Sequence, residues 1–566
     1  MKKANKKVTS NKSVWKRLLK MLLKYRMQLL VIFLCLLCAA VLTFLQPILI
    51  QRIIDEGLIS KSFKRLLILL LAYTVMSVFL SIVKLPEIFC YVKIRNSFSK
   101  ELNYSILNKL ERIQLSNLSD KSSTETVNVL TSDINNLVAL TENITAFSIS
   151  SFLQVISGIL GMAYIDKKLT LCVIAMIPIK IVIVEMFSKK KSAIMERYIE
   201  KNRKYASWLG DMVSGIRELK LWDIYAIEKK DFSNILNQCN NQYKESALCD
   251  QYRSVLEEIL NQIMLVLLYL FGGIALIKGN ISLGKVLAFI TYSSFVISPF
   301  SLLINVRYMI ASIKPSAIRF FDFIDSSEEE NLRNPYNTSD SADNGNKKYP
   351  LISFEDIKFS YNKQTEVLTK LDLQVMRGEH IGIIGDNGSG KSTLLDLLIG
   401  FLQPSAGTMR LDGVPYEQLN LRQIRSKIAY ISQKPFLYQR SIMDNIDIRH
   451  NSSQSSIHKL CKMLGLEQLI SRLKSGLCTN IGNEGEKLSG GERQKIAIAR
   501  ELLKGADIFL FDEATNNCDQ ETRVRLSNLI NCQLKDKTVI IISHNNDVRE
   551  LDKIYMLTNG KLKRMK

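Results

Sequence analysis

Six apolar segments in the first part of the chain constrain its fold more than any other feature. They lie at 28–50, 65–84, 146–164, 169–188, 257–277 and 285–308. An apolar helix needs about 20 residues to cross the roughly 30 Å of hydrocarbon in a bilayer. Each segment is therefore expected to be a membrane-spanning helix, whereas the residues after about 350 alternate as a soluble α/β domain would.

The connections between these segments alternate in length. Tight turns are expected at Asp166–Lys168 and at Gly279-Asn280, whereas the segments after the second and fourth spans run for about 60 to 70 residues. These long connections are rich in Lys and Arg and almost free of Pro and Gly, which predicts helices that continue into the cytoplasm. Each must reverse direction, around Asn117–Thr124 and Gly215–Tyr225, and the reversing segments are expected to touch the soluble domain.

Basic residues are concentrated at the N-terminus. The net charge is +22, and residues 1–26 carry ten Lys and Arg and no Asp or Glu. Such a run keeps an N-terminus in the cytoplasm and attracts anionic lipid. No basic platform interleaved with aromatic residues is found, so no nucleic-acid partner is expected. The first span is too long for a cleaved signal peptide and begins too early for an N-terminal peptidase domain.

Lys180 is a cation about 11 residues into the fourth apolar segment. Charged residues inside spans are candidates for function. Lys180 either faces a water-filled cavity, where it would attract an anionic group of a substrate, or it snorkels or pairs across helices without touching substrate. The Cys35/Cys38 pair in the first segment is expected to serve packing or lipid contact, because the ten cysteines show no disulfide or metal-binding spacing.

These patterns divide the chain into four parts. Residues 1–27 form a basic cytoplasmic N-terminus, and 28–324 a transmembrane domain with six helices and two long cytoplasmic connections. The polar stretch 325–350 contains Ser, Asn, Asp and Gly and is expected to be a linker. Residues 351–566 form the α/β domain.

A glycine-rich loop after a short apolar run points to phosphate binding. The run 381–384 predicts a buried strand, and 394–399 predicts a helix. Between them lies the G-x-x-x-x-G-K-S loop, made of Gly385, Asp386, Asn387, Gly388, Ser389, Gly390, Lys391, Ser392 and Thr393. In this setting backbone N–H groups close around phosphates, the lysine reaches the β and γ oxygens, and the serine hydroxyl ligates Mg²⁺.

Two further apolar runs end at polar residues. The run 508–511 predicts a strand ending at Asp512-Glu513, and 539–542 predicts one ending at Ser543-His544. Ligands bind beyond the carboxyl ends of such strands. Asp512 is suited to Mg²⁺, and Glu513 to orienting or deprotonating an attacking water.

The stretch Leu488–Gln494 reads Leu-Ser-Gly-Gly-Glu-Arg-Gln. By itself this is a helix N-terminus that could bind an anion. Its place between the glycine-rich loop and Asp512-Glu513 is typical of the ATPase cassette of ABC transporters. The chain resembles a bacterial ABC exporter half-transporter, in which six spans are fused to one nucleotide-binding domain, over nearly its whole length.

This resemblance implies ATP and Mg²⁺ as cofactors and assigns roles to matching residues. Tyr361 would stack on adenine, and Gln433 would sense Mg²⁺ and water. Ser489, Gly490 and Gly491 would contact the γ-phosphate of ATP held by the opposite subunit, near Asp519, and His544 would be the switch histidine. The implied catalytic residues are Glu513, His544 and Gln433, and the implied metal ligands are Ser392, Gln433 and Asp512.

Because each such signature faces another subunit's loop, the resemblance also implies a dimer with two sandwiched ATP molecules. A homodimer is favoured over a heterodimer, since Lys391, Glu513, Ser489 and His544 are all present. Two stretches depart from the family pattern: Asn516-Asn517-Cys518-Asp519 replaces Ser-Ala-Leu-Asp, and Gly482-Asn483-Glu484-Gly485 replaces Gly-Glu-Arg-Gly. Both departures concern how the ATP sites are coupled to each other and to the reversing segments, and neither removes a group needed for hydrolysis.

The expected function is ATP-driven export across a bacterial cytoplasmic membrane. The stretch Gly215–Leu221 resembles a segment of some peptide and siderophore exporters, which favours a small peptide or peptide-like substrate. The alternatives are a lipid or hydrophobic-drug exporter, and an importer or membrane sensor with the same fold. A soluble-type ATPase acting on nucleic acid is disfavoured by the six fused spans.

Overall fold

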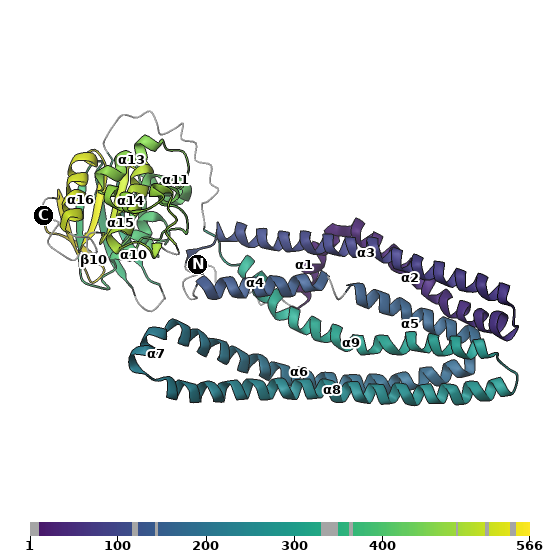
Figure 1. Cartoon of the computed structure of the whole chain (residues 1–566). Coiled ribbons are helices and arrows are strands. Elements are labelled where there is room, and N and C mark those ends of the chain that lie inside the picture. The colour runs from purple at the N-terminus through teal and green to yellow at the C-terminus, as the bar shows by residue number, and fades with distance from the viewer. Residues whose placement is uncertain are drawn as a thin grey trace. The chain divides into compact units, whose positions relative to one another are not determined.

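The computed structural model of the chain describes residues 11–115, 123–141, 145–329, 349–361, 366–482, 485–514, 520–543 and 551–566. They fall into two compact units (Figure 1). The helical unit comprises Met1–Glu111 and Leu118–Ser326, and the α/β unit comprises Arg112–Asn117 and Ser327–Lys566. A helical domain followed by an α/β domain is the expected fold class.

Long α-helices joined by short turns make up the helical unit. They are α1 (Asn11–Leu22), α2 (Arg26–Arg52), α3 (Phe63–Leu110), α4 (Ser123–Ala139), α5 (Thr145–Ile165), α6 (Lys167–Ser214), α7 (Ile216–Trp222), α8 (Tyr225–Ile277) and α9 (Leu283–Ile324). A 3₁₀ turn, Leu23–Tyr25, precedes α2, and a π-helical turn, Ile53–Ile59, follows it.

Each expected span lies inside one of these helices, namely α2, α3, α5, α6, α8 and α9. In the described residues, four stretches are long and apolar enough to cross a membrane: Val14–Ile59, Phe63–Leu110, Lys167–Ser214 and Tyr225–Ile277. In α5 and α9 the apolar stretches are shorter, Ile149–Ile165 and Leu283–Ile297. The count of six spans therefore stays a prediction.

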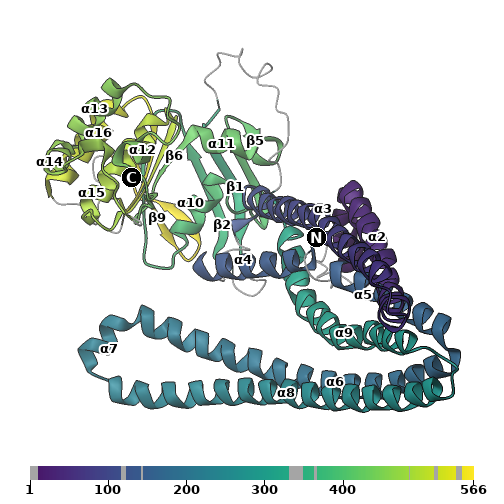
Figure 2. The same cartoon turned by 45° about the vertical axis from the view of Figure 1, so that its right-hand side comes forward.

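The second long connection is helical, as expected. Helices α6 and α8 run side by side and are joined at their tip by α7 (Figures 1 and 2). The chain reverses at Gly215–Tyr225, where Asp223 takes a left-handed backbone with φ 49°. The prediction of a reversal there is confirmed. The other predicted reversal, Asn117–Thr124, lies outside the described residues except for Ser123 and Thr124 at the start of α4.

Both predicted tight turns are confirmed. Asp166 stands between α5 and α6, and its carboxylate caps α6 by accepting hydrogen bonds from the backbone N–H groups of Lys168 and Leu169 at 2.7 and 3.0 Å. Gly279, with φ 73°, turns the chain between α8 and α9. A capping acid and a left-handed glycine are the residues that such helix ends favour.

Small residues let α5 and α9 pack closely. A Cβ atom on Gly161 of α5 would overlap the ring of Tyr292 on α9, and one on Gly158 would lie 2.7 Å from the Val296 side chain. Tyr292 is fully buried, and its hydroxyl donates to the carbonyl of Phe44 on α2. Close approach over small residues is the usual basis of helix association in membranes.

Two sheets form the framework of the α/β unit (Figure 2). The antiparallel sheet has the order β2-β1-β4-β5, with β1 (Ile352–Phe359), β2 (Leu368–Val375), β4 (Ala406–Leu411) and β5 (Val414–Pro415). The larger sheet has the order β10-β9-β3-β8-β7-β6, with β3 (His380–Ile384), β6 (Ile428–Ile431), β7 (Ile508–Asp512), β8 (Thr538–Ser543), β9 (Lys553–Thr558) and β10 (Lys561–Arg564).

The core of the larger sheet is parallel, and only the β9–β10 pair is antiparallel. Its central strands are the three runs predicted from sequence, now seen as β3, β7 and β8. Ile381, Ile508 and Ile540 are fully buried in them. Near-continuous apolar strands are typical of a parallel sheet that is covered on both faces.

Helices and short 3₁₀ turns complete the α/β unit. They are α10 (Lys391–Ile399), α11 (Leu421–Lys427), α12 (Ile442–Ile446), α13 (Gln454–Met463), α14 (Glu467–Arg472), α15 (Gly490–Leu503) and α16 (Gln520–Gln533), with 3₁₀ turns at Tyr416–Gln418 and Gly476–Cys478. The predicted helix after the glycine-rich loop is α10, and the predicted helix at the Ser-Gly-Gly stretch is α15.

The chain segments that leave α3 and α9 pair with each other inside the α/β unit. We call Arg112–Leu115 and Ser327–Glu329 the clip. The Glu329 N–H donates to the Arg112 carbonyl at 2.8 Å, and the Gln114 N–H donates to the Ser327 carbonyl at 3.3 Å. The Glu329 carboxylate accepts two hydrogen bonds of 2.8 Å from the guanidinium of Arg425 on α11. The two helix ends therefore continue into one anchored structure.

Candidate active site

The glycine-rich loop joins β3 to α10 in the predicted order. Gly390 precedes the helix with φ 103°, a backbone that favours glycine. A Cβ on Gly385 would lie 2.5 Å from the Leu557 carbonyl oxygen, so only glycine fits there. The Lys391 ammonium donates to the carbonyls of Gly385 and Asp386 at 2.5 and 3.0 Å. The lysine thus lies folded over its own loop.

The loop presents polar groups suited to a phosphate. Asp386, Asn387, Gly388 and Ser392 are exposed. The Ser389 hydroxyl is buried and has no hydrogen-bond partner among the described residues. A buried hydroxyl without a partner is costly, and a phosphate oxygen beside the loop would accept a hydrogen bond from it.

Tyr361 lies next to the start of α10. Its hydroxyl is 3.1 Å from that of Thr393, and its ring packs edge-on against Phe359 with 4.9 Å between centroids. Tyr361 is 59% exposed, so a planar partner could reach it. This is the place where an aromatic could stack on a base whose phosphates lie in the loop.

Strand register brings the acidic pair to the loop. Ile384 at the end of β3 pairs with Ser543 on β8, and Asp512 at the end of β7 pairs with Ile542 on the same strand. The carboxyl ends of these parallel strands therefore share one edge of the sheet, as expected.

Glu513 and Gln433 contact each other at this edge. The Gln433 side-chain amide donates to the Glu513 carboxylate at 2.8 Å, across 80 residues of sequence. Glu513 takes a left-handed backbone with φ 48°, and its N–H donates to the Ile542 carbonyl at 3.1 Å. Non-glycine residues in this conformation are strained and concentrate at functional sites. The strained backbone and the amide together orient the carboxylate.

Burial and neighbouring charges shift the pKa values of ionisable groups around the loop. Burial lowers the pKa of Lys391, although the nearby Glu513, Asp386 and Asp512 carboxylates oppose that shift. Burial also raises the pKa of Asp396 on α10 to about 6, and the negative charge of Asp512 adds to the rise. Carboxylates crowded in this way favour a cation between them and the phosphates.

Two residues of this cluster were not predicted from the sequence. The Tyr430 hydroxyl on β6 donates to Asp512 at 3.0 Å, and burial is the main cause of its raised pKa. Asp396 is the second. The short apolar run Ile428–Ile431, which was not predicted as a strand, was a usable signal for Tyr430, whereas Asp396 lies inside an apolar helix and offered none.

The Ser-Gly-Gly stretch begins α15. The Ser489 hydroxyl accepts a hydrogen bond from the Glu492 N–H, and the Glu492 carboxylate accepts one from the Ser489 N–H at 2.8 Å, which is a capping box. Burial alone would raise the pKa of Glu492, but the bonds to Ser489 and the Arg472 guanidinium hold it below its ordinary value. Ser489 and Gly490 are exposed. Gln494, on the same helix, donates to the Ser432 carbonyl beside Gln433 at 3.2 Å.

Several predicted residues lie outside the described part of the chain. They are Asn483, Glu484, Asn516, Asn517, Cys518, Asp519 and His544. The structure therefore brings together Lys391, Ser392, Gln433, Asp512 and Glu513, and the roles assigned to all the site residues stay predictions.

Comparison with protein families decides the identity. Residues 29–300 match the family model of the ABC transporter transmembrane region, and residues 368–516 match that of the ABC transporter. The chain is an ABC transporter. Its ATPase domain implies ATP binding and hydrolysis, and its apolar helices make it a multi-pass membrane protein of the exporter type with a cytoplasmic ATPase domain.

Known proteins resemble the transporter over most of its length. It is 28% identical to an ATP-dependent lipid A-core flippase of Alcanivorax borkumensis, over 75% of this chain and 71% of the flippase. It is also 28% identical to a lactococcin-A transport/processing protein of Lactococcus lactis, over 78% of this chain and 61% of that protein. A bacterial Atm1-family ABC exporter with ATP bound has the same fold, with a TM-score of 0.79 and 19% identity over 95% and 94% of the two chains.

Proposed function

We propose that the transporter exports a small peptide or peptide-like compound, using ATP bound at two composite sites of a dimer. A lactococcin-A transport/processing protein among its relatives supports a peptide substrate. A lipid substrate is the second candidate, because a lipid A-core flippase is equally similar. The observation that carries the ATP-driven part is the contact of Gln433 with Glu513 beside the glycine-rich loop.

In this proposal the loop holds the phosphates. Backbone N–H groups of residues 385–391 would surround them, and Lys391 would leave its two carbonyl acceptors for the β and γ oxygens. Tyr361 would stack on the adenine. The unpartnered Ser389 hydroxyl supports this assignment, since it needs an acceptor at that point.

A magnesium ion fits the donors at this edge of the sheet. Mg²⁺ usually binds through one or two carboxylates together with phosphates and waters, and Asp512 would supply the carboxylate, with Ser392 and Gln433 offering further oxygens. Bound there, it would neutralise charge on the phosphates. Tyr430 would hold the Asp512 carboxylate in position through its 3.0 Å hydrogen bond.

Glu513 would act on the attacking water. Its carboxylate, held by Gln433 and by the left-handed backbone, would orient the water or take its proton. A movement of the segment that contains Gln433 would therefore change the position of the catalytic carboxylate. Gln494 bonds that segment to α15. His544 would complete the γ-phosphate contacts.

The half-transporter architecture implies a dimer in a membrane. We infer that the exposed Ser489 and Gly490 at the positive end of α15 face ATP held by the second subunit, near Asp519. A homodimer is the simpler arrangement, because this chain carries both the loop side and the signature side of a site. A heterodimer is the alternative.

Closure of the two ATPase domains would drive alternating access of the helices. The reversing helix α7 is suited to receive this motion, because it ends in Leu221 and Trp222, which are 72% and 77% exposed. Large apolar side chains exposed at the tip of a hairpin mark a protein contact surface. Hydrolysis would then reset the transporter.

Replacing Glu513 by Gln tests the catalytic assignment. The variant should bind ATP normally yet hydrolyse it about a hundredfold or more slowly, because general-base help is lost. Glu355→Gln, at an exposed position on β1, is the matched control. Turnover in Glu513→Gln at the wild-type rate would refute the role.

Uptake into inside-out vesicles tests the substrate class. ATP should drive accumulation of apolar peptides in vesicles containing the wild type and not in vesicles containing Glu513→Gln. Accumulation of a labelled lipid in place of every peptide tried would favour the second candidate.

A further inference from the structure

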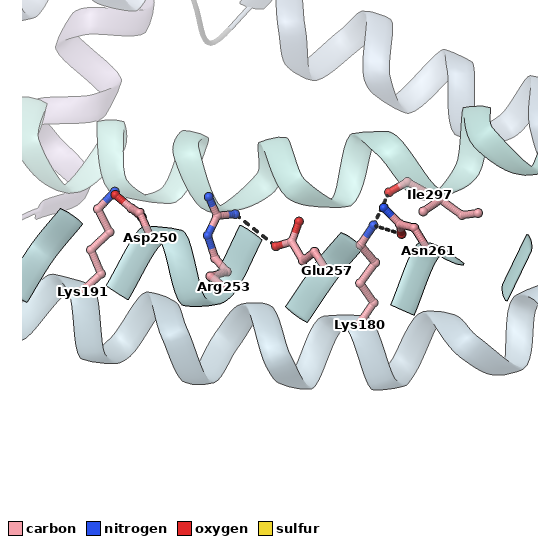
Figure 3. A network of polar contacts seen from close by, with 7 residues as sticks. All are labelled: Lys180, Lys191, Asp250, Arg253, Glu257, Asn261 and Ile297. Atoms are coloured by element: carbon pink, nitrogen blue, oxygen red, sulfur yellow. Dashed lines mark hydrogen bonds and ion pairs between the residues drawn. The ribbon is translucent and has the colours of Figure 1, made fainter. Parts of the chain in front are cut away.

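A row of charged side chains follows the contact between α6 and α8 (Figure 3). Lys191 pairs with Asp250 at 2.7 Å, and Arg253 pairs with Glu257 at 3.1 Å. Lys180 is the remaining member. The row thus contains three cations and two carboxylates, and both carboxylates are engaged by cations other than Lys180.

Lys180 is held by neutral acceptors. Its ammonium donates to the Asn261 side-chain oxygen on α8 at 3.3 Å and to the Ile297 carbonyl on α9 at 2.8 Å. Figure 3 shows the side chain reaching toward both. Within the described part of the chain, no carboxylate lies within ion-pair distance of it. Glu257 attracts it from further along α8 but is bonded to Arg253.

The surroundings of Lys180 distinguish between the alternatives expected from the sequence. The side chain is only 6% exposed and points inward to α8 and α9, so it does not snorkel to a membrane surface. It does pair across helices, but its partners carry no charge. An ammonium has three donors, and two hydrogen bonds are seen. Among the residues that the structure describes, the ammonium therefore makes hydrogen bonds but no ion pair.

The position of Lys180 makes that charge costly. It lies 13 residues from the start of α6, which is about 20 Å along the helix. Asn261 lies 16 residues from the end of α8 and Ile297 14 from the start of α9, about 24 and 21 Å from the same side. Lys180 and Ile297 are therefore well inside the membrane-spanning part, and Asn261 lies four residues inside the cytoplasmic end of the expected span 257–277. An unpaired charge at the depth of Lys180 is expensive and is usually functional.

A small cavity adjoins the ammonium. Lys180 and Asn261 line it together with apolar side chains that include Val173, Ile177 and Met264. It has about 20 Å³ of free space, enough for roughly one water molecule. A planar carboxylate needs less room beside the ammonium than a tetrahedral phosphate does. An apolar wall with one cation suits an anionic head on an apolar body.

We propose that Lys180 and Asn261 form a substrate subsite that receives the carboxylate of an apolar peptide or peptide-like compound. This assignment rests on the proposed export function and specifies its substrate. The carboxylate would accept a hydrogen bond from the ammonium and supply a directly paired counter-charge. The body of the substrate would lie against the apolar side chains outside the small cavity.

Paired probes test the subsite. A short fluorescent peptide of Leu and Phe, with a free C-terminal carboxylate or with a C-terminal amide, is titrated against the full-length transporter in phosphatidylcholine nanodiscs. Empty nanodiscs give the background. The acid should bind the wild type about tenfold to a hundredfold more tightly than the amide, as expected for a buried charge-assisted hydrogen bond.

Two variants and a control locate the preference. Lys180→Met should bring the ratio of the two affinities to about one. Asn261→Asp, which keeps Lys180 and supplies an internal carboxylate, should do the same even if Lys180→Met folds poorly. Lys189→Met removes an exposed cation of α6 that pairs with Glu185. It should keep the preference.

Several results would overturn the proposal. These are equal binding of acid and amide to the wild type, no binding of either, and a preference that survives in both variants. Lys180-dependent binding of lysophosphatidic acid without binding of the acid peptide would also reject a carboxylate subsite. ATP-driven uptake of acid and amide to the same extent would leave export intact and remove the subsite alone. A Lys180-dependent preference for the acid without any ATP-driven uptake would support the subsite and contradict the proposed export function.

Discussion

Replacing Glu329 by Gln should loosen the clip that joins the ends of α3 and α9 to the ATPase domain. Glu329 accepts two hydrogen bonds of 2.8 Å from Arg425, and its side chain is 9% exposed. The Arg425 guanidinium also lies 4.8 Å from the centre of the Phe401 ring and donates to the Gly400 carbonyl at 3.0 Å. The substitution removes the negative charge but keeps the shape of the side chain.

The free-energy cost of Glu329→Gln can be estimated from how far the pair with Arg425 is buried. Removing one partner of a fully buried ion pair costs about 3–5 kcal/mol. The Arg425 side chain is 26% exposed, and in the variant it would retain its contacts with the Gly400 carbonyl and the Phe401 ring. We therefore expect a cost of about 2–3 kcal/mol, which corresponds to an opening equilibrium about 30- to 150-fold larger.

Hydrogen exchange measures that opening directly. The Glu329 and Gln114 amides are bonded across the clip, so peptides that contain them should exchange faster by the same factor in Glu329→Gln. Lys427→Met on the same helix, which breaks only the exposed pair with Asp412, is the control. Transport per ATP hydrolysed should fall in Glu329→Gln, because both helix ends lose a shared anchor.

Unchanged exchange of these amides in Glu329→Gln would refute the estimate of the cost. Faster exchange with an unchanged ratio of transport to hydrolysis would show that the clip is a structural feature without a part in coupling.

Further predictions concern the site and the helix packing. Because the Asp396 pKa is raised to about 6, its ionised form destabilises the fold, and this penalty develops as pH rises from about 4 to about 6. Asp396→Asn should therefore raise the melting temperature without Mg²⁺ at about pH 7.5, and the gain should vanish near pH 4; an equal gain at both pH values would contradict this. Gly161→Leu should prevent α5 from packing against Tyr292 and cost about 2 kcal/mol or more, seen as a lower melting temperature, whereas Gly210→Leu, with open space around it, should be tolerated.

Features of the fold could be predicted from the sequence where they depend on one short segment. The glycine-rich loop, the strands β3, β7 and β8 and the reversal at Gly215–Tyr225 could be located because each depends on neighbouring residues. The ends of parallel strands then placed Asp512 and Glu513 beside the loop, as the strand register confirms.

Contacts between distant segments could not be predicted in this way. Tyr430 reaches Asp512 across 82 residues, and Arg425 reaches Glu329 across 96. Such contacts depend on which strands are neighbours and on how far each side chain extends, and neither property is visible in a single segment.

The sequence by itself determined that this chain has long apolar helices joined to a phosphate-binding α/β domain, because span length and loop geometry are local requirements of the bilayer and of phosphate. It placed a cation at Lys180 but left its surroundings open. Only the tertiary structure decided that this ammonium meets Asn261 and Ile297 rather than a carboxylate. The reason is physical: the partners of a buried charge are set by the packing of three helices whose contacting residues lie 81 and 117 positions away.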